Sequence, residues 1–500
     1  MDLNEKQIAA LVDEIVARLR PAAESNAPTP KMSGGCAPAP IVLPTARESA
    51  RATKTTVSTG RAAAGKSGIF DELDGAVEAA SRAQAEWVKQ TLEQRAAVIA
   101  AMRKAALDNL DALAMRAVAE TGLGRVEDKV AKNRLAATKT PGIEILRPAH
   151  VQSGDDGLTL EEYAPFGVIG SVTPTTNPTE TIINNGISII AGGNSVVFNC
   201  HPSAKGVSVW CTQLLNEAIV GAGGPANLLA AVANPTIESA QALMKHAGIR
   251  LLVVTGGPAV VKQAMGSGKK VIAAGPGNPP VVVDDTADLN RAARGIIKGA
   301  SIDNNILCTA EKEVIVVDEV ADALKKKLVE AGCIEVKGRD VARLEKIVCD
   351  AHGPNKKFVG KDASVILREI GAAASSECRL AIAEVDEAHP FVQHELLMPV
   401  LPIVRVKNVD DGIAMAKRVE HGFGHTAVMY STDISALHRM ARTINTSIFV
   451  KNDCNLAGLG LGGEGWTSFT IASPTGEGLT NARSFCRLRR CTLKEYFRIV

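Results

Sequence analysis

The chain has 500 residues, of which 46% are hydrophobic and 22% are charged, and its formal net charge is +2. This length is enough for two or three domains, and the charge gives no reason to expect nucleic-acid binding. No run of about eighteen apolar residues predicts a membrane span, and the acidic residues from Asp2 onward do not fit a secretory signal. The ten cysteines include no CxxC pair, which is typical of reduced cytosolic thiols.

Residues 1–20 predict a short amphipathic helix. Apolar residues recur there at three- and four-residue steps, with acids and bases between them, and Pro21 ends the pattern. Residues 21–66 are rich in Ala, Pro, Ser, Thr and Gly, which predicts a flexible linker. We expect a tethered docking helix that lays its apolar stripe in a groove of a partner. A disordered tail with a chance pattern is the alternative.

The pattern from residue 70 to residue 137 is helical, and residues 148–163 are polar and strand-like. Apolar strands then alternate with helices. The expected strands of this first series are 166–172, 194–199, 227–233, 250–256 and 269–275, and its expected helices are 179–193, 203–220 and 237–248. A second series follows Asp284, with strands at 313–318 and 401–406 and helices at 289–301, 320–332 and 411–419. This alternation predicts two α/β domains with doubly wound parallel sheets.

Several predicted strands end in Gly, Pro or Asn, as in VTPTTNPTE, FNCHPSAKG, VTGGPAV and AAGPGNPP. Doubly wound sheets bind ligands at such ends, where glycines let the backbone approach a ligand and helix N-termini donate to phosphate. The pattern favours a nucleotide site, although no GxGxxG or Walker A motif lies at these strand ends.

Cys308 follows Asn304 and Asn305 and precedes an apolar strand. A loop thiol beside amide side chains and free backbone N–H groups is a candidate nucleophile with an adjacent oxyanion hole. The alternative that the residues leave open is a small buried side chain. No metal site is expected, because the GFG between His421 and His425 does not favour a helix and no HExxH motif occurs.

From about residue 70 to the end, the chain resembles the CoA-acylating branch of the aldehyde dehydrogenase superfamily. The resemblance is to propionaldehyde and acetaldehyde dehydrogenases of bacterial microcompartments. It is carried, in order, by PFGVIGSVTPTTNPTETIINN, FNCHPSAKG, TGGPAVV, AAGPGNPP, DNNILCTAEKEVIVVD, HELLMPVLPIVRV, EHGFGHTAVMYS and SFTIASPTGEGLTNARSFCRLRRC. Residues 1–20 also resemble the encapsulation helix of enzymes in such organelles.

The resemblance implies that Cys308 attacks a short-chain aldehyde, that hydride passes to NAD, and that a thioester remains on the protein. The amide of Asn177 and the Cys308 backbone N–H would hold the oxyanion. One departure is Leu307, where relatives often have proline before the nucleophile; it would change the stiffness of the loop but not the chemistry.

The resemblance also implies a coenzyme A acceptor. Hydrolytic aldehyde dehydrogenases carry a water-activating glutamate in an ELGG-type loop, whereas the matching AAGPGNPP has no carboxylate between Lys270 and Asp284. A CoA thiol ionises more readily than water and needs less help from a base. The alternatives are a hydrolytic aldehyde dehydrogenase that releases the acid and a non-catalytic protein that binds a shell.

The cofactor-binding residues follow from the same motifs. Gly256 and Gly257 match the loop beneath the nicotinamide, and Glu395 matches the glutamate that contacts its ribose. Pro202 lies where hydrolytic members carry a lysine that contacts the adenine-side ribose, which leaves NADP open although the family favours NAD. The remaining residues expected at the cofactor are Thr175, Thr255, Gly275 and Pro399.

The resemblance gives an aldehyde dehydrogenase-like α/β fold with five parts. The expected parts are a docking helix at 1–20, a linker at 21–66, an NAD- and CoA-binding domain at 67–147 and 164–283, an oligomerisation arm at 148–163 and 480–500, and a catalytic domain at 284–479. The expected assembly is a homodimer or a dimer of dimers, and no nucleic-acid or membrane partner is expected. The expected location is the bacterial cytoplasm, in the lumen of a microcompartment whose shell or core proteins bind residues 1–20.

Overall fold

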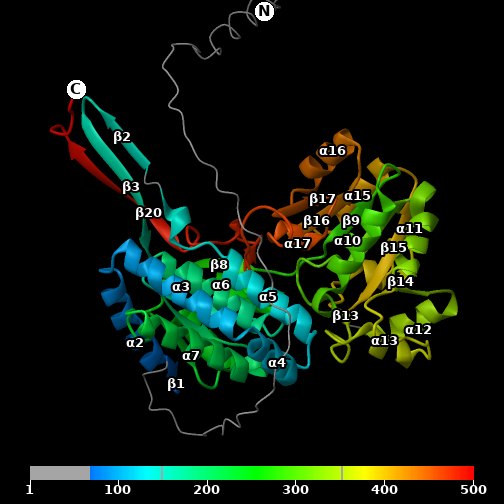
Figure 1. The fold of residues 1–500 in the computed structure, drawn as a ribbon, viewed down its shortest axis with the longest axis horizontal. Coiled ribbons are helices and arrows are strands. Elements are labelled where there is room, and N and C mark those ends of the chain that lie inside the picture. Colours follow the sequence, from blue (N-terminus) through cyan, green and yellow to red (C-terminus); the bar gives the residue numbers. More distant parts are fainter. Residues whose placement is uncertain (1–67, 148–149, 351–352) are drawn as a thin grey trace, which may run out of the picture. The chain divides into compact units, whose positions relative to one another are not determined.

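The computed structural model describes residues 68–147, 150–350 and 353–500, all of which belong to one compact unit. The predicted helix at 1–20 and the predicted linker at 21–66 lie outside the described residues. Two parallel sheets and one small antiparallel sheet organise the rest (Figure 1). The expected elements of both α/β series are present, with ends within about three residues of the prediction.

The first sheet has six parallel strands in the order β1-β6-β5-β4-β7-β8. Their bounds are β1 (Ile69–Phe70), β4 (Val168–Val172), β5 (Ser195–Asn199), β6 (Leu229–Val232), β7 (Leu251–Thr255) and β8 (Lys270–Ala274). The helices of this lobe are α2 (Leu73–Trp87), α3 (Leu92–Asp108), α4 (Leu110–Thr121), α5 (Val126–Lys139), α6 (Pro178–Ala191), α7 (Lys205–Gly221), α8 (Ile237–Lys245) and α9 (Pro258–Met265).

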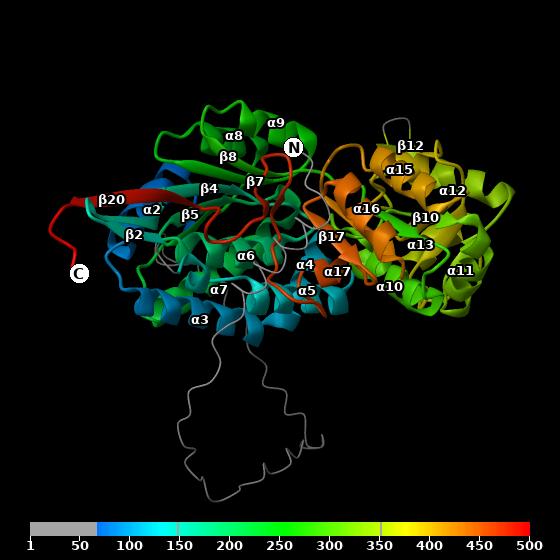
Figure 2. The same ribbon diagram turned by 90° about the horizontal axis from the view of Figure 1, so that it is seen from above.

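Helices cover both faces of the first sheet because its strands are apolar on both sides. In β4, Val168 packs with residues of α2 and α8, whereas the next residue, Ile169, packs with residues of α3, α6 and α7. Figure 2 shows α8 and α9 on one side of the strands and α6 and α7 on the other. The carboxyl ends of the strands are thereby left as the place for a site.

The second sheet has seven parallel strands in the order β11-β14-β15-β10-β9-β16-β17. Their bounds are β9 (Pro280–Val283), β10 (Glu313–Val317), β11 (Ile334–Val336), β14 (Ala381–Glu384), β15 (Val400–Val406), β16 (Thr426–Tyr430) and β17 (Ile448–Lys451). Strand β9 pairs with β10 and β16, so the second sheet begins before Asp284, where the sequence suggested the start of the second domain.

Helices flank the second sheet as well. They are α10 (Leu289–Ser301), α11 (Asp318–Glu330), α12 (Arg339–Val348), α13 (Ala363–Glu369), α14 (Pro390–Gln393), α15 (Val409–Val419), α16 (Ile434–Ile444) and α17 (Asn455–Gly458). Residues of α10 and α11 pack against one face, and residues of α15 and α16 pack against the other. The shorter elements are η1 (Ile143–Leu146), η2 (Pro202–Ala204), η3 (Ile302–Asn305), β12 (Cys349–Asp350), β13 (Gly353–Pro354), β18 (Ile471–Ala472) and β19 (Gly478–Leu479).

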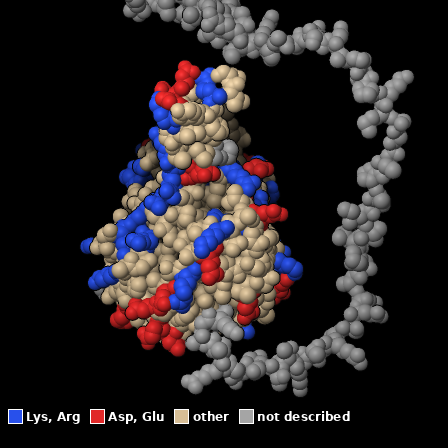
Figure 3. All heavy atoms as spheres, turned by 90° about the vertical axis from the view of Figure 1, so that its left-hand side faces the viewer, with Lys and Arg blue, Asp and Glu red and all other residues tan. Residues whose placement is uncertain are grey.

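The segments expected to form an arm lie in a third, antiparallel sheet. Strands β2 (His150–Gly154), β3 (Gly157–Pro165) and β20 (Cys486–Lys494) pair in the order β2-β3-β20. Figure 3, which faces this sheet, shows Lys and Arg beside Asp and Glu, and Arg490 pairs with Glu161 at 2.7 Å. The exposed apolar side chains on these strands are Val151, Leu488 and Leu493. Association of two copies through this sheet stays a prediction.

Among the described helices, none is both long and apolar enough to cross a membrane.

Candidate active site

A cavity of about 610 Å³ lies at the carboxyl ends of β4, β5, β7 and β8. The second lobe contributes Cys308 and Glu395 to its wall, and a later segment contributes Leu459 and Phe469. Its volume is in the range of pockets that bind cofactors and small substrates. The wall includes nine of the ten residues expected at the site: Cys308, Asn177, Thr175, Pro202, Thr255, Gly256, Gly257, Gly275 and Glu395.

Pro399 is the expected residue that does not line this cavity. It immediately precedes β15, and its carbonyl accepts a hydrogen bond from the backbone N–H of Ala381 at 3.0 Å. Its place in the fold is the start of a strand of the second sheet.

The turn that carries Cys308 is left-handed. Asp303, Asn304 and Asn305 have φ angles of 48°, 55° and 66°, a conformation that Asn and Asp tolerate better than other side chains with a Cβ. Their side chains fix the turn: Asn304 Nδ2 donates to the Gly360 carbonyl at 2.9 Å, and Asn305 Nδ2 donates to the Ala300 carbonyl at 2.7 Å. Asn304 and Asn305 therefore hold residues 303–308 in place. We call these residues the nucleophile turn, after the role that the sequence predicts for Cys308.

The environment of Cys308 contains charges of both signs. Burial raises the pKa of the Cys308 thiol to about 12, the Glu395 carboxylate raises it as well, and the Lys312 ammonium opposes the rise. Lys312 is buried and donates to Asn305 Oδ1 at 2.6 Å, the Asn305 carbonyl at 2.8 Å and the Leu307 carbonyl at 3.3 Å. The Lys312 ammonium therefore contacts the residues that immediately precede Cys308. The sequence analysis did not identify Lys312 as part of the site.

Glu395 is the only carboxylate among the described residues that line the cavity. Burial raises its pKa to about 7, while Lys312 and a hydrogen bond with the Gly277 backbone lower it. The loop from Gly275 to Pro279 supplies no carboxylate. Instead, buried Asn278 ties it to the second lobe by donating to the carbonyls of Val392 and Val419, each at 2.9 Å.

Asn177 is the residue before α6, which begins at Pro178. It is 6% exposed. Its Oδ1 accepts from Lys132 Nζ at 2.5 Å, and its Nδ2 lies 3.2 Å from Thr176 Oγ1. Because a carboxamide nitrogen carries two hydrogens, Asn177 has a donor to spare for a group in the cavity. Lys132 is a second buried lysine that the sequence reading missed.

His425 follows His421 by four residues, and the sequence predicts no metal site at this pair. It is 1% exposed, its Nδ1 pairs with Thr426 Oγ1 at 2.9 Å, and its Nε2 has no partner in the described part of the chain. Burial, followed by Lys312, lowers its pKa to about 4, so the ring is neutral near pH 7. His421 instead contacts the Gln393 carbonyl. Within residues 68–147, 150–350 and 353–500, no three His, Cys, Asp or Glu side chains come together as metal ligands.

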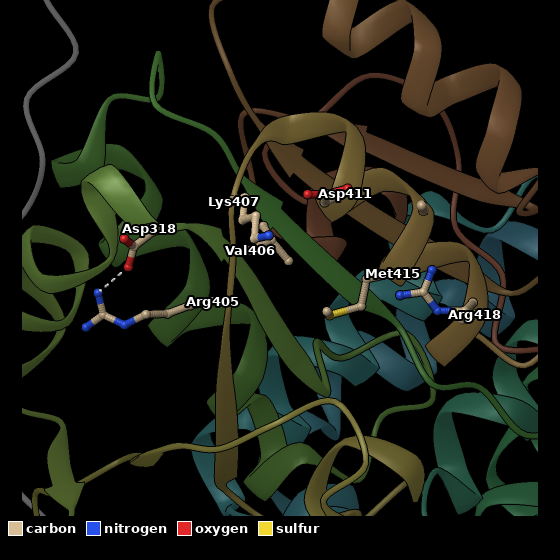
Figure 4. A pocket seen from close by; sticks show the side chains of 8 residues that line it. Asp318, Arg405, Val406, Lys407, Asp411, Met415 and Arg418 are labelled. Carbon is tan, nitrogen blue, oxygen red and sulfur yellow. Dashed lines mark hydrogen bonds and ion pairs between the residues drawn. The ribbon is translucent and has the colours of Figure 1, made fainter.

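A second cavity of about 570 Å³ lies beside β15 and α15 (Figure 4). Arg405 pairs there with Asp318 at 3.0 Å, and Arg418 pairs with Glu387 at 2.7 Å. None of the expected site residues lies in its wall. The expected residues that line a cavity therefore line the first one.

Known proteins resemble the chain over most of its length. The profile of the aldehyde dehydrogenase family matches residues 49–336 and 380–469. Acetaldehyde dehydrogenase (acetylating) EutE of Escherichia coli is 54% identical over 449 residues, which are 88% of this chain and 96% of that protein.

Solved structures agree with the sequence relatives. One is the propionaldehyde dehydrogenase of Rhodopseudomonas palustris with bound CoA and an acylated cysteine, with a TM-score of 0.85, 50% identity, and coverage of 87% of this chain and 100% of that one. Another is a propionaldehyde dehydrogenase from the Clostridium phytofermentans fucose utilisation bacterial microcompartment. Its TM-score is 0.85 at 46% identity, with coverage of 87% and 100%.

Proposed function

The chain belongs to the aldehyde dehydrogenase family and to its CoA-acylating branch, and on this premise we propose how its residues perform the reaction. The substrate is a short-chain aldehyde, with acetaldehyde and propionaldehyde as first candidates, and the products are acyl-CoA and NADH. The observation that carries the proposal is the shared cavity. It brings the left-handed Cys308 turn, the spare donor of Asn177 and the glycine-rich strand ends of the first lobe to one space.

The residues fit a nicotinamide dinucleotide. Gly257 precedes α9, and a Cβ placed on it would meet nothing within 4 Å, so the backbone is open to a ligand. Thr175 Oγ1 is buried without a partner in the described chain and lines the same cavity. In this site the bound cofactor supplies a hydride acceptor. Thr175, Pro202, Thr255, Gly256, Gly257, Gly275 and Glu395 are the residues that would hold it.

The first half of the reaction ends with an acyl group on Cys308. The Cys308 thiolate adds to the aldehyde carbon, and the negative charge moves to the aldehyde oxygen, where Asn177 Nδ2 and the Cys308 backbone N–H donate to it. A bound nicotinamide dinucleotide would take the hydride from the same carbon, so that the carbonyl can re-form. A thioester remains on Cys308, and the thiol proton is released.

The second half transfers the acyl group to coenzyme A. The CoA thiolate adds to the thioester carbon, Cys308 leaves as thiolate, and acyl-CoA is the product. The support for CoA over water is the loop from Gly275 to Pro279, which has no carboxylate to activate a water molecule. Among the described residues of the wall, Glu395 is the one acidic side chain. Whether it activates water in place of CoA is tested by the measurement of NADH without CoA.

We further propose that the enzyme works in the lumen of a bacterial microcompartment, with residues 1–20 as its docking helix, and that it forms a homodimer or a dimer of dimers. The Clostridium phytofermentans relative comes from such an organelle, and residues 1–20 have an amphipathic pattern ahead of a Pro- and Ala-rich stretch. The exposed apolar residues of the β2-β3-β20 sheet support self-association through that sheet.

The test is a stopped-flow measurement of NADH with propionaldehyde and NAD, with and without CoA. Without CoA we expect a burst of one NADH per Cys308 and then near arrest, because the thioester waits for its acceptor. With CoA we expect continuous turnover and propionyl-CoA in the products, and Cys308→Ala should remove both signals. Continuous NADH and propionate without CoA would instead identify a hydrolytic enzyme, and a complete lack of NADH would identify a non-catalytic protein.

A further inference from the structure

A buried group of four charged side chains lies behind the cavity wall. Lys129 and Lys132 come from α5, Asp303 from the nucleophile turn and Glu180 from α6, and each side chain is at most 2% exposed. Lys132 Nζ lies 2.5 Å from Asp303 Oδ2 and 3.3 Å from Glu180 Oε1, and Lys129 Nζ lies 2.9 Å from Asp303 Oδ2. We call these four residues the α5 ion cluster. It joins the nucleophile turn to the helix that follows Asn177.

The cluster pairs two lysines with two carboxyl groups. Burial, followed by the neighbouring Lys132, lowers the pKa of Lys129. Burial opposes the charged form of Lys132, but Asp303 and Glu180 outweigh it and raise the pKa of Lys132. Burial also opposes ionisation of Asp303, yet the two lysines hold its pKa below the usual value. Because buried ion pairs contribute little net stability compared with apolar packing, stability alone is a weak reason for four charges at this place.

The contact of Lys132 with Asn177 gives the cluster a link to the reaction. An ammonium group can only donate hydrogen bonds, so the Asn177 atom that faces Lys132 Nζ at 2.5 Å must be the oxygen. The Asn177 nitrogen is then turned the other way, where one of its hydrogens reaches Thr176 Oγ1 and the second is available. Without Lys132, the two orientations of this amide would be close in energy.

Lys129 provides a contrast within the same helix. It donates to the Thr176 carbonyl at 3.1 Å and to Asp303, but no described contact joins it to the Asn177 side chain. The two lysines therefore share burial and a carboxylate partner, and they differ in their contact with the amide.

We propose that Lys132 is a positioning residue for the aldehyde oxidation: it orients the Asn177 amide so that Nδ2 faces the oxygen of the bound aldehyde, and through Asp303 it keeps that amide in register with the Cys308 turn. This proposal rests on the proposed function, in which Asn177 stabilises the oxyanion. Lys132 itself touches neither the substrate nor the cofactor.

The experiment compares K132M, K129M, N177A and the double variant N177A/K132M in the NADH burst without CoA. Loss of one oxyanion donor slows such reactions roughly 100-fold or more, so we expect this loss in N177A and a similar loss in K132M. The double variant should be no slower than N177A, because Lys132 has no amide left to orient. K129M should lose clearly less than K132M.

Protection of Cys308 is a second readout that needs no cofactor. Propionaldehyde should shield Cys308 from iodoacetamide by forming the thiohemiacetal, and K132M should require roughly tenfold more aldehyde for the same protection, because the oxygen loses its donor. Lys132 also lowers the pKa of the Cys308 thiol, behind Lys312, so alkylation without aldehyde should be slower in K132M than in the parent protein. Protection is therefore expressed relative to each variant's own rate without aldehyde. A change in that rate alone, with the aldehyde dependence unaltered, would overturn the inference.

The outcomes separate the two proposals. If N177A/K132M is slower than N177A by the full factor of K132M, Lys132 acts elsewhere and the inference fails, while the role of Asn177 stands. If N177A leaves the burst unchanged, the oxyanion assignment fails and takes the inference with it. Should circular dichroism reveal that K132M is unfolded, K132Q replaces it in the same cycle. K132Q retains an N–H donor toward Asn177, so we expect it to lose less activity than N177A, and a loss equal to that of N177A would overturn the inference.

Discussion

At the scale of single residues, the reactivity of Cys308 depends on opposing charges. Burial and Glu395 favour the neutral thiol, and Lys312 favours the thiolate. Lys312 donates to carbonyl and amide oxygens of Asn305 and Leu307, so its ammonium group is fixed next to Cys308. In the proposed reaction, the attacking thiolate is therefore a minor form of Cys308 at neutral pH.

The pH dependence of Cys308 alkylation tests this balance. With a thiol pKa of about 12, the rate of reaction with iodoacetamide should rise with each pH unit from 6 to 9 and reach no plateau, because only the thiolate reacts. Lys312→Met removes a cation, which raises the pKa further, so alkylation at each pH should slow roughly tenfold or more. Mass spectrometry of the Cys308 peptide measures the rate.

The exposed thiol of Cys491 is the internal standard in the same samples. Lys417→Met is the control, since Lys417 is exposed and lies outside the cavity wall, yet it also donates to a carbonyl, that of Ile444 at 3.0 Å. A plateau near pH 7 in the parent protein would contradict the high pKa. An unchanged rate in Lys312→Met would show that this cation has no influence on the nucleophile.

At the scale of elements, the loop between β8 and β9 connects the two sheets and passes beneath the nucleophile. A Cβ added to Gly277 would lie 2.9 Å from the Cys308 carbonyl oxygen and 2.9 Å from His425 Cγ. The first neighbour is a backbone atom and the second is a ring atom of buried His425, so neither is the flexible end of a side chain. Because Gly277 has no side chain, the Cys308 backbone can lie close to the loop between β8 and β9.

Gly277→Ala should therefore displace the nucleophile. We expect kcat to fall roughly 100-fold, as for displacements of about 1 Å in other sites, together with about 1–3 kcal/mol of stability from overpacking. Steady-state kinetics and urea unfolding measure the two effects. Gly221→Ala is the control, because a Cβ there meets nothing within 4 Å. A Gly277→Ala enzyme with the parent kcat would refute this account of the loop.

The same scale shows what a sequence can and cannot predict. The alternation of strands and helices predicted both parallel sheets, because each element buries a local apolar pattern. The charged residues of α5 gave no signal for Lys129 and Lys132. Their partner Asp303 lies 174 residues from Lys129 in the chain, and charged side chains in a helix ordinarily face solvent. Only the fold shows that both lysines are buried.

At the scale of the whole molecule, the cavity is assembled from distant segments. Besides the two lobes, the segment after α17 returns to the first lobe, where Phe469 N donates to Asn184 Oδ1 at 3.1 Å and Thr470 Oγ1 donates to Asn185 Oδ1 at 3.0 Å. Ordered motifs over most of the chain predicted nine of the residues in the wall, since they carry the resemblance to a family. Lys312 and His425 lie within the same motifs, but their burial and contacts follow only from the fold.

Residues 1–20 are predicted to dock the enzyme to a partner, a role separate from the reaction proposed at the cavity. Deletion of residues 1–20 should leave kcat and KM within about twofold of the parent values, because the residues proposed for catalysis and cofactor binding lie between Thr175 and Glu395. It should abolish co-purification of the enzyme with intact microcompartments when it is expressed with shell proteins, since the docking stripe is gone.

Point variants make this last prediction specific for the apolar stripe. Ile8→Asp with Ile15→Asp places charges in the stripe and should act like the deletion. Glu5→Gln with Glu14→Gln changes two residues that are polar in the predicted helix and should keep encapsulation. Enzyme that still enters shells without residues 1–20 would contradict the docking role. Because the first pair adds two negative charges and the second removes two, encapsulation lost equally in both pairs would contradict a specific role of the apolar stripe.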